Sequence, residues 1–339
     1  MQSKFFKIAL PIGFVLIGLV AGYFLHNTVS GQNTSGPGLR ENDPQYPLTQ
    51  PLLLCSEKSS FYEYTPLADK IKNYIDQKKK DGSVSDISYY FKDLNSGQWT
   101  GVNENDRYSP ASLLKVAVMF AYLKLTEQDP SILAKGVLYD TKENLNQSEY
   151  FSATTTLKQG ASYTFASLIQ TMIENSDNNA LAVLENFIDQ KSLNEVYTDL
   201  GLPLPPSQDS TSTIDYISTK LYSHFFRVLY NATYLDRDLS EKALEILSQT
   251  NFKQGIAAGV PAGTKVADKF GERTAETANG VVDFRELHDC GIVYMTGNPY
   301  TICIMTKGKS DFNTLSNIIK DISAITYTEV SVGIDKTTK

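Results

Sequence analysis

The chain has few of the side chains that build metal centres, with three cysteines and three histidines among 339 residues. No cysteine or histidine pair has the spacing of a zinc site, so the sequence predicts neither a metal nor another cofactor. Basic residues are not in excess, since the net charge is -7, which argues against nucleic acid as a partner. Aromatic residues, at 11%, supply ample material for a core in one large domain or two modest ones.

One long apolar run lies near the start of the chain, from Ile8 to Leu25, and basic residues precede it. It is about as long as the shortest helix that spans a bilayer. We expect a single-pass anchor at 5–25, with residues 1–4 in the cytoplasm and the remainder outside the cell membrane. A cleaved signal peptide is the alternative, but the run is long for that purpose and ends in a poor cleavage sequence.

Residues 26–60 are rich in Gly, Pro, Ser, Asn and Gln in their first half and predict a flexible linker. A folded domain is expected at 61–329 and a short tail at 330–339. Apolar spacing and turn residues predict helices at 65–80 and 311–325, and strands at 84–91, 98–102, 264–272, 287–295 and 300–307.

Strands near both ends of the domain, with helical sequence between them, indicate an α/β (α+β) fold. We expect one antiparallel sheet built from 61–107 and 255–329, flanked by helices, with an all-helical insertion at 108–254.

The stretch from Tyr108 to Lys115 predicts the start of a buried helix. Ser109 suits the N-cap and Pro110 the first helical position, and the sequence that follows is almost entirely apolar. Ser112 then lies three residues before Lys115, on the same helix face. Burial and the positive helix end both lower the pKa of an amine, so Lys115 could act as the base for a Ser112 nucleophile. The plainer alternative is a core helix that happens to contain both residues.

Two further motifs follow at positions that such a nucleophile needs. Ser176 and Asn178 flank Asp177 after a helical segment, although Ser, Asp and Asn are also ordinary helix-end residues. Lys269 and Gly271 lie on a predicted strand, where the glycine permits close approach of a substrate backbone. An exposed edge strand with a solvated lysine explains the second motif equally well when it is taken alone.

The three motifs, in this order, resemble those of the penicillin-recognising serine enzymes, most closely the class A β-lactamase-like catalytic domain. The resemblance covers about 61–327 and implies a β-lactamase/transpeptidase-like fold. It implies that Ser112 is acylated, that Lys115 accepts its proton and that Ser176 relays a proton to the leaving nitrogen. The roles implied for substrate binding are amide binding by Asn178, positive charge from Lys269, and an oxyanion hole from the N–H groups of Ser112 and Glu272.

The chain departs from this family at two places. Phe270 stands where a hydroxyl residue is usual, and Arg273 could replace the lost contact to the substrate carboxylate. The Glu-x-x-Leu-Asn sequence, whose glutamate positions the deacylating water, is absent. Asp209 and Asp215 are the acids near the corresponding region. We therefore expect fast acylation followed by slow deacylation.

Three functions remain open at this level. The chain could hydrolyse β-lactams, or act on D-alanyl peptides of the cell wall as a carboxypeptidase or penicillin-binding protein. It could also be a sensor that stays acylated. A Ser-His-Asp hydrolase is disfavoured, because His26 precedes the domain and His224 and His288 fall in a predicted helix and strand. Cys290 and Cys303 are expected on one face of a hairpin but diagonally placed, which leaves a disulfide open.

Overall fold

The computed structural model describes residues 39–54, 64–151, 156–205 and 214–337. The expected anchor at 5–25 lies outside these ranges. No helix in the described ranges is long and apolar enough to cross a membrane.

Part of the predicted linker is packed against the domain, which corrects that prediction for the residues that are described. Strands β1 (Leu39–Arg40) and β2 (Leu52–Leu54) pair with each other. Between them, the backbone N–H groups of Leu48 and Thr49 each donate to the Glu241 carboxylate at 2.8 Å. Leu48 is buried, so this segment is held by both an apolar contact and charge-assisted hydrogen bonds.

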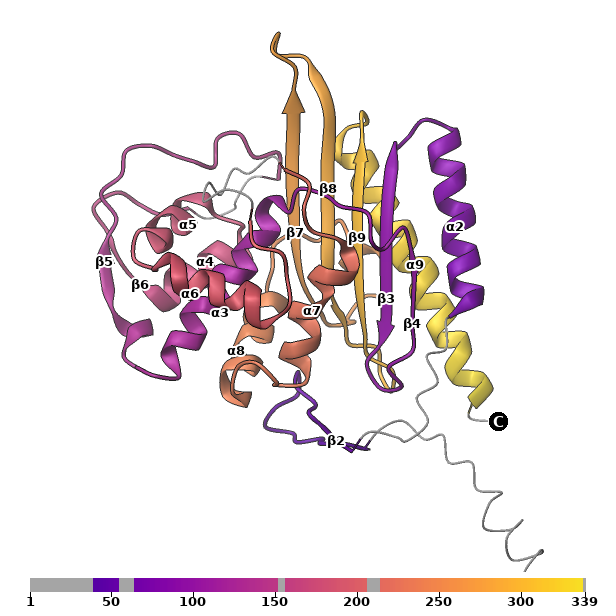
Figure 1. Ribbon diagram of the computed structural model, residues 1–339, viewed down its shortest axis with the longest axis horizontal. Coiled ribbons are helices and arrows are strands. Elements are labelled where there is room, and N and C mark those ends of the chain that lie inside the picture. The colour runs from indigo at the N-terminus through magenta and orange to yellow at the C-terminus, as the bar shows by residue number, and fades with distance from the viewer. Residues whose placement is uncertain (1–38, 55–63, 152–155, 206–213, 338–339) are drawn as a thin grey trace, which may run out of the picture. The chain divides into compact units, whose positions relative to one another are not determined.

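The expected antiparallel sheet is confirmed and has five strands in the order β4-β3-β9-β8-β7. Its N-terminal hairpin forms the β4 edge, and the three C-terminal strands complete it (Figure 1). The strands extend further than the sequence predicts at several ends: β3 is Asp86–Asp93, β4 Trp99–Val102, β7 Val266–Glu276, β8 Val282–Val293 and β9 Tyr300–Gly308.

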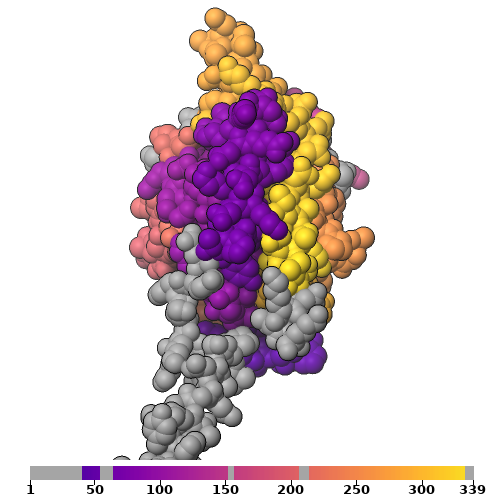
Figure 2. All heavy atoms as spheres, turned by 90° about the vertical axis from the view of Figure 1, so that its right-hand side faces the viewer, coloured from indigo at the N-terminus to yellow at the C-terminus, as the bar shows by residue number. Residues whose placement is uncertain are grey.

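Helices α2 (Thr65–Lys80) and α9 (Phe312–Thr337) cover one face of the sheet. They lie side by side on the face shown in Figure 2. The bounds of α2 agree with the prediction, and its apolar stripe is buried as the 3.6-residue period requires. Helix α9 continues well beyond its predicted end at residue 325.

The helical part packs on the other face of the sheet (Figure 1). It also contains a small two-stranded sheet, so the prediction of an all-helical insertion is wrong in this detail. The elements are α3 (Lys115–Thr126), β5 (Gly136–Leu138), β6 (Ser162–Thr164), α4 (Phe165–Glu174), α5 (Asn178–Glu185), α6 (Gln190–Asp199), α7 (Thr219–Tyr230) and α8 (Arg237–Ser248).

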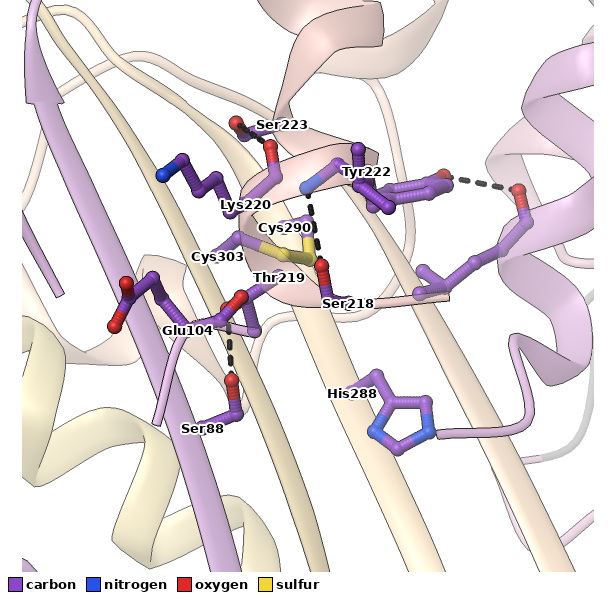
Figure 3. The surroundings of a disulfide bond; sticks show 12 residues. Ser88, Glu104, Ser218, Thr219, Lys220, Tyr222, Ser223, His288, Cys290 and Cys303 are labelled. Atoms are coloured by element: carbon purple, nitrogen blue, oxygen red, sulfur yellow. Dashed lines mark hydrogen bonds between the residues drawn. A yellow bond between two sulfur atoms is a disulfide. The ribbon is translucent and has the colours of Figure 1, made fainter. Parts of the chain in front are cut away.

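Cys290 and Cys303 form a disulfide between β8 and β9, beneath the first turn of α7 (Figure 3). They are directly opposite in the strand register, so the expected diagonal placement is wrong. Both are fully buried on the face that packs against the helical part. The disulfide therefore links neighbouring strands of the sheet beneath α7.

Candidate active site

The nucleophile lies on a tight turn and not in the first turn of an α-helix, which corrects the sequence prediction. Residues Ala111–Leu114 form a 3₁₀ turn, η1, and α3 begins only at Lys115. Ala111 has a φ of 48°, a left-handed backbone conformation that a continuous α-helix cannot contain. Pro110 therefore precedes the turn and occupies the N-cap position that the sequence assigns to Ser109. Ser112 is presented at the junction of two kinds of helix.

Lys115 lies at the centre of the site and is 1% exposed. Its Nζ donates to Ser112 Oγ at 2.7 Å and to Asn178 Oδ1 at 2.7 Å. It also reaches the Ser176 carbonyl at 2.7 Å and Ser176 Oγ at 3.1 Å. Burial lowers the pKa of Lys115 to about 8, although neighbouring carboxylates oppose the shift. The amine is thus both in contact with the serine hydroxyl and able to lose its proton near neutral pH.

Ser176 and Asn178 reach this lysine because the chain turns sharply between α4 and α5. Ser176 has a φ of 54°, and Asp177 caps α5 by accepting from the Ala180 N–H at 2.7 Å. A non-glycine residue in this region carries strain of the order of 1–3 kcal/mol. The strained turn places the carbonyl and hydroxyl of Ser176 on the same ammonium group.

Lys269 approaches Ser176 from strand β7 and is fully buried. Its Nζ donates to Ser176 Oγ at 3.0 Å and to the Phe270 carbonyl at 2.8 Å. Burial and the nearby charge of Lys115 hold its pKa well below the usual range. The three sequence motifs therefore meet at one hydroxyl, that of Ser176.

Gly271 permits a close approach within the protein that the sequence did not predict. A Cβ at this position would lie 2.9 Å from the Pro110 carbonyl oxygen and 3.1 Å from the Leu113 nitrogen. The glycine thus admits the backbone of the nucleophile turn itself, where we had expected a substrate. This close approach brings Glu272, the next residue on β7, into the wall of the cavity that also contains Ser112.

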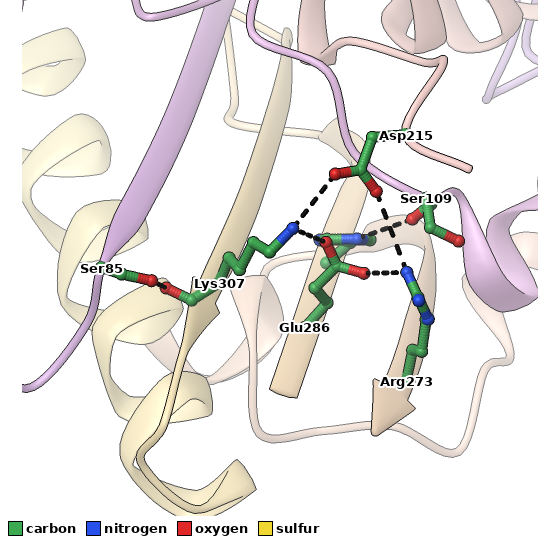
Figure 4. Close-up of polar contacts among 7 residues, drawn as sticks. Ser85, Ser109, Asp215, Arg273, Glu286 and Lys307 are labelled. Atoms are coloured by element: carbon green, nitrogen blue, oxygen red, sulfur yellow. Dashed lines mark hydrogen bonds and ion pairs between the residues drawn. The ribbon is translucent and has the colours of Figure 1, made fainter. Parts of the chain in front are cut away.

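Arg273 also lines this cavity, but its guanidinium is engaged. Nη1 lies 3.1 Å from Glu286 and 3.8 Å from Asp215, and Lys307 contacts the same two carboxylates (Figure 4). A substrate carboxylate would have to compete with these partners. Asp215, a candidate for activating water in the sequence analysis, belongs to this network and not to the cavity wall. The other candidate, Asp209, lies outside the described residues.

Phe270 points away from the cavity, into an aromatic cluster. Its ring stacks on Phe252 with centroids 4.3 Å apart and contacts Phe151 at 5.9 Å. The Phe151 N–H in turn donates to the Glu272 carboxylate at 3.0 Å. The aromatic residue that replaces the usual hydroxyl therefore anchors the loop segment that contains Phe151 beside the site.

This loop contributes an acid that the sequence analysis missed, Glu149. Its carboxylate accepts from Asn178 Nδ2 at 2.7 Å. It also forms a hydrogen bond with the carboxyl group of Glu272, and burial and this contact raise the pKa of Glu272 to about 8. Glu149 and Glu185 both line the cavity, which has a volume of about 420 Å³. No motif marks either residue, since their placement depends on loop and helix packing.

Of the predicted residues, four line the cavity together with Ser112: Lys115, Asn178, Glu272 and Arg273. Ser176, Lys269 and Gly271 are buried behind them. His288 is buried on β8, where Nε2 lies 2.9 Å from the Ser109 carbonyl, and burial lowers its pKa to about 4. It does not contact Ser112. Among the described residues no cluster of His, Cys, Asp and Glu could hold a metal ion.

Comparison with solved structures shows the same fold in proteins of low sequence identity. PBP-A has a TM-score of 0.67 at 19% identity, with 80% of this chain and 97% of that chain covered. An acyl-enzyme complex of a PBP-A mutant with penicillin G gives a TM-score of 0.67 at 20% identity, covering 80% and 98%. A class A β-lactamase from Mycobacterium abscessus gives 0.66 at 20% identity, covering 78% and 99%.

No curated protein sequence matches the chain significantly. The model of the beta-lactamase enzyme family, however, matches residues 66–330. This range contains every element of the site, from the nucleophile turn to the edge strand β7. The chain therefore belongs to the beta-lactamase enzyme family.

Proposed function

We propose that the protein is an exported, membrane-anchored serine hydrolase that is acylated at Ser112 by β-lactams or D-alanyl peptides. The observation that carries this proposal is the 2.7 Å hydrogen bond between Lys115 Nζ and Ser112 Oγ. A buried amine in contact with a serine hydroxyl is the arrangement that activates a nucleophile. Membership of the family supports the reaction class.

Acylation follows from the positions of the three motifs. Neutral Lys115 takes the proton of Ser112, and Oγ attacks the carbonyl carbon of the substrate amide. The N–H groups of Ser112 and Glu272 stabilise the oxyanion of the tetrahedral intermediate. When the C–N bond breaks, Ser176 Oγ gives its proton to the leaving nitrogen and is reprotonated by Lys115, which holds the proton taken from Ser112. Lys269 keeps the Ser176 hydroxyl oriented through the 3.0 Å hydrogen bond from its Nζ.

Deacylation is proposed to be slow. It needs a water held by a base that is free to accept a proton. Glu149 is an acid that contacts a motif residue directly. Its carboxylate is, however, already bound to Asn178 and in contact with Glu272. Lys115 can act again as the base after the leaving group departs, but less well toward β-lactams, because the ring remnant hinders the approach of water. The acyl-enzyme should therefore accumulate.

The location of the catalytic domain outside the cell membrane, with an anchor at 5–25, is part of the same proposal. The Cys290–Cys303 disulfide supports it, because disulfides persist mainly in oxidising compartments. An extracytoplasmic reporter fused after Lys339 would be active if the topology is right. Activity only of a cytoplasmic reporter at that end would refute it.

The test of acylation is the intact mass of the protein before and after addition of penicillin G, followed over time. We expect one adduct of the mass of the whole drug, formed quickly and lost slowly. Ser112→Ala should remove the adduct, whereas Ser148→Ala, a change of another serine that lines the same cavity, should retain it. An adduct that survives in Ser112→Ala would refute the assignment. A D-alanyl peptide in place of the drug tests the second substrate class.

A further inference from the structure

A second cavity, remote in the fold from Ser112, lies between helix α7 and the β3–β4–β9 part of the sheet. Its volume is about 270 Å³, close to the lower end of the range of small-molecule sites, about 300–1,000 Å³. One stripe of α7 forms its helical wall: Lys220, Ser223, His224 and Arg227. The strand wall consists of Tyr90, Lys92, Trp99 and Thr301.

The stripe on α7 has the spacing i, i+3, i+4 and i+7 that usually faces a core with apolar side chains. Here it presents basic and polar groups to the sheet. Figure 3 shows Lys220 and Ser223 on the side of the helix opposite Tyr222, the residue that packs toward the nucleophile turn. The cavity is therefore separate from the proposed active site, although the same helix borders both.

Among the described residues the basic groups of this cavity have no carboxylate partner, although Lys92 Nζ donates to the Gly97 carbonyl at 3.1 Å. No Asp or Glu lines it, and no ion pair joins Lys92, Lys220 or Arg227 to a carboxylate within the described residues. Asp93 acts on Lys92 from outside the cavity, but its Oδ1 accepts the N–H groups of Asn95 and Ser96. In a chain of net charge -7, this grouping of cations is unexpected.

The cations also repel one another. Burial lowers the pKa of Lys92, and the charge of Arg227 lowers it further. The pKa of His224 is likewise lowered by burial and by the charges of Arg227, Lys92 and Lys220. Each of these groups would regain its charged form more easily beside a bound anion, so an anion in the cavity would relieve the repulsion.

A second, independent observation comes from Thr301 on β9. Its side chain is 1% exposed, lines the cavity, and its hydroxyl has no hydrogen-bond partner. Buried hydroxyls without a partner are rare in native proteins and are costly. A ligand oxygen in the cavity would supply the missing partner. Thr301 lies opposite Lys92 in the strand register, so the hydroxyl and one of the cations act from the same place on the sheet.

We infer that this cavity binds a small multiply charged oxyanion, of the class of phosphate monoesters, through Lys92, Lys220, Arg227 and the Thr301 hydroxyl. The anion would accept charge-assisted hydrogen bonds from the three cations, which are the strongest available to it. Lys220 lies over the ring of Trp99, 4.6 Å from its centroid, so anion binding at Lys220 would change the surroundings of that ring. The inference is independent of the proposed acylation at Ser112.

Trp99 makes the test direct, because it is the one tryptophan of the chain. The full-length protein in detergent is titrated with inorganic phosphate and with glycerol 3-phosphate at constant ionic strength, and tryptophan fluorescence and calorimetric heat are recorded. We expect a saturable response with the same midpoint in both measurements. Sodium chloride of equal ionic strength should produce none.

Variants locate the binding. Arg227→Gln and Lys220→Gln should each weaken it by about tenfold or more, since each removes a charge-assisted contact. Thr301→Val should weaken it while leaving the melting temperature unchanged or higher, because no hydrogen bond within the protein is lost. Lys191→Gln, at an exposed lysine of α6, should bind like the parent. Absence of saturable heat, or equal affinity in all four variants, would overturn the inference.

Discussion

The carboxyl group of Glu272 contacts that of Glu149 in the wall of the Ser112 cavity, and burial together with this contact raises the pKa of Glu272 to about 8. The pair joins β7 to the loop that contains Phe151, whose N–H donates to the same Glu272 carboxyl. Two acids that approach one another in this way cannot both ionise without repulsion. The contact between the two acids is therefore weakened when Glu272 loses its proton.

This relationship predicts a pH dependence of stability. The pKa of Glu272 is raised to about 8 in the folded protein, above its ordinary value of 4.5. The stability that protonated Glu272 contributes to the folded protein is fully present below the pKa of the unfolded state. It is lost as the pH rises through about 8. Glu272→Gln cannot lose a proton, so its melting temperature should rise relative to the parent between about pH 5 and pH 9. Glu276→Gln, exposed on the same strand, should follow the parent. A constant difference across this range would contradict the raised pKa of Glu272.

Acylation should become faster as the pH rises. Only neutral Lys115 can take the Ser112 proton, and its pKa is about 8. Its neutral fraction grows from roughly one-tenth at pH 7 to about half at pH 8, so the acylation rate constant should rise roughly fivefold. Stopped-flow measurement of the penicillin adduct tests this. The rise in the acylation rate constant should persist in Glu272→Gln. This variant removes the acid that titrates in the same pH range, so the remaining pH dependence can be assigned to Lys115. A flat profile in that variant would exclude Lys115 as the base.

Lys115→Ala should abolish acylation and lower stability moderately. A buried lysine without partners could be removed at no cost, but this one donates to four oxygens on Ser112, Ser176 and Asn178. Leaving buried acceptors unpartnered costs about 1–3 kcal/mol per group, partly offset because a buried charge is also removed. Urea unfolding measures the change. Lys115→Met, which restores the volume, should show a similar loss; full recovery of stability by Met would mean that packing, and not hydrogen bonding, is responsible.

Release of the acyl group should depend little on Glu149. Because its carboxylate is bound to Asn178 and Glu272, we expect Glu149→Gln to keep the steady-state rate of cephalosporin hydrolysis within about twofold. Glu185→Gln is the matched comparison, because Glu185 also lines the cavity and, like Glu149, belongs to none of the three motifs. Burst and steady phases are read from the same trace. A loss of about tenfold in the steady phase alone would identify the changed residue as the water-activating base and refute our account of slow turnover.

Phe270→Thr should destabilise the protein without creating the carboxylate contact usual in the family. The ring is 4% exposed and stacks on Phe252, so truncation opens a cavity in the aromatic cluster. Losses for buried aromatic residues are about 3–5 kcal/mol. Thermal unfolding should show a large decrease, and the KM for penicillins should not improve. An improved KM would show that the side chain at this position faces the substrate.

Much of the scaffold follows from local patterns in the sequence. The sequence pattern predicts α2, the hairpin before the nucleophile and the strands near the C-terminus, because the periodicity of apolar side chains indicates which face of an element is buried. The three motifs could also be ordered and given roles before any coordinate was known. Each is short, so its geometry is set by the few residues within it and by the resemblance to a family.

The tertiary structure decided what depends on residues distant in the chain. Ala111 takes a left-handed conformation in the nucleophile turn, against which β7 packs at Gly271. Glu149 reaches Asn178 and Glu272 because its loop is anchored on an aromatic cluster. Spacing along one segment specifies which side chains share a face of a helix or strand. This spacing does not specify which other segment packs against that face. The charges, strain and hydrogen bonds of this site arise from such contacts between segments that are distant in the chain.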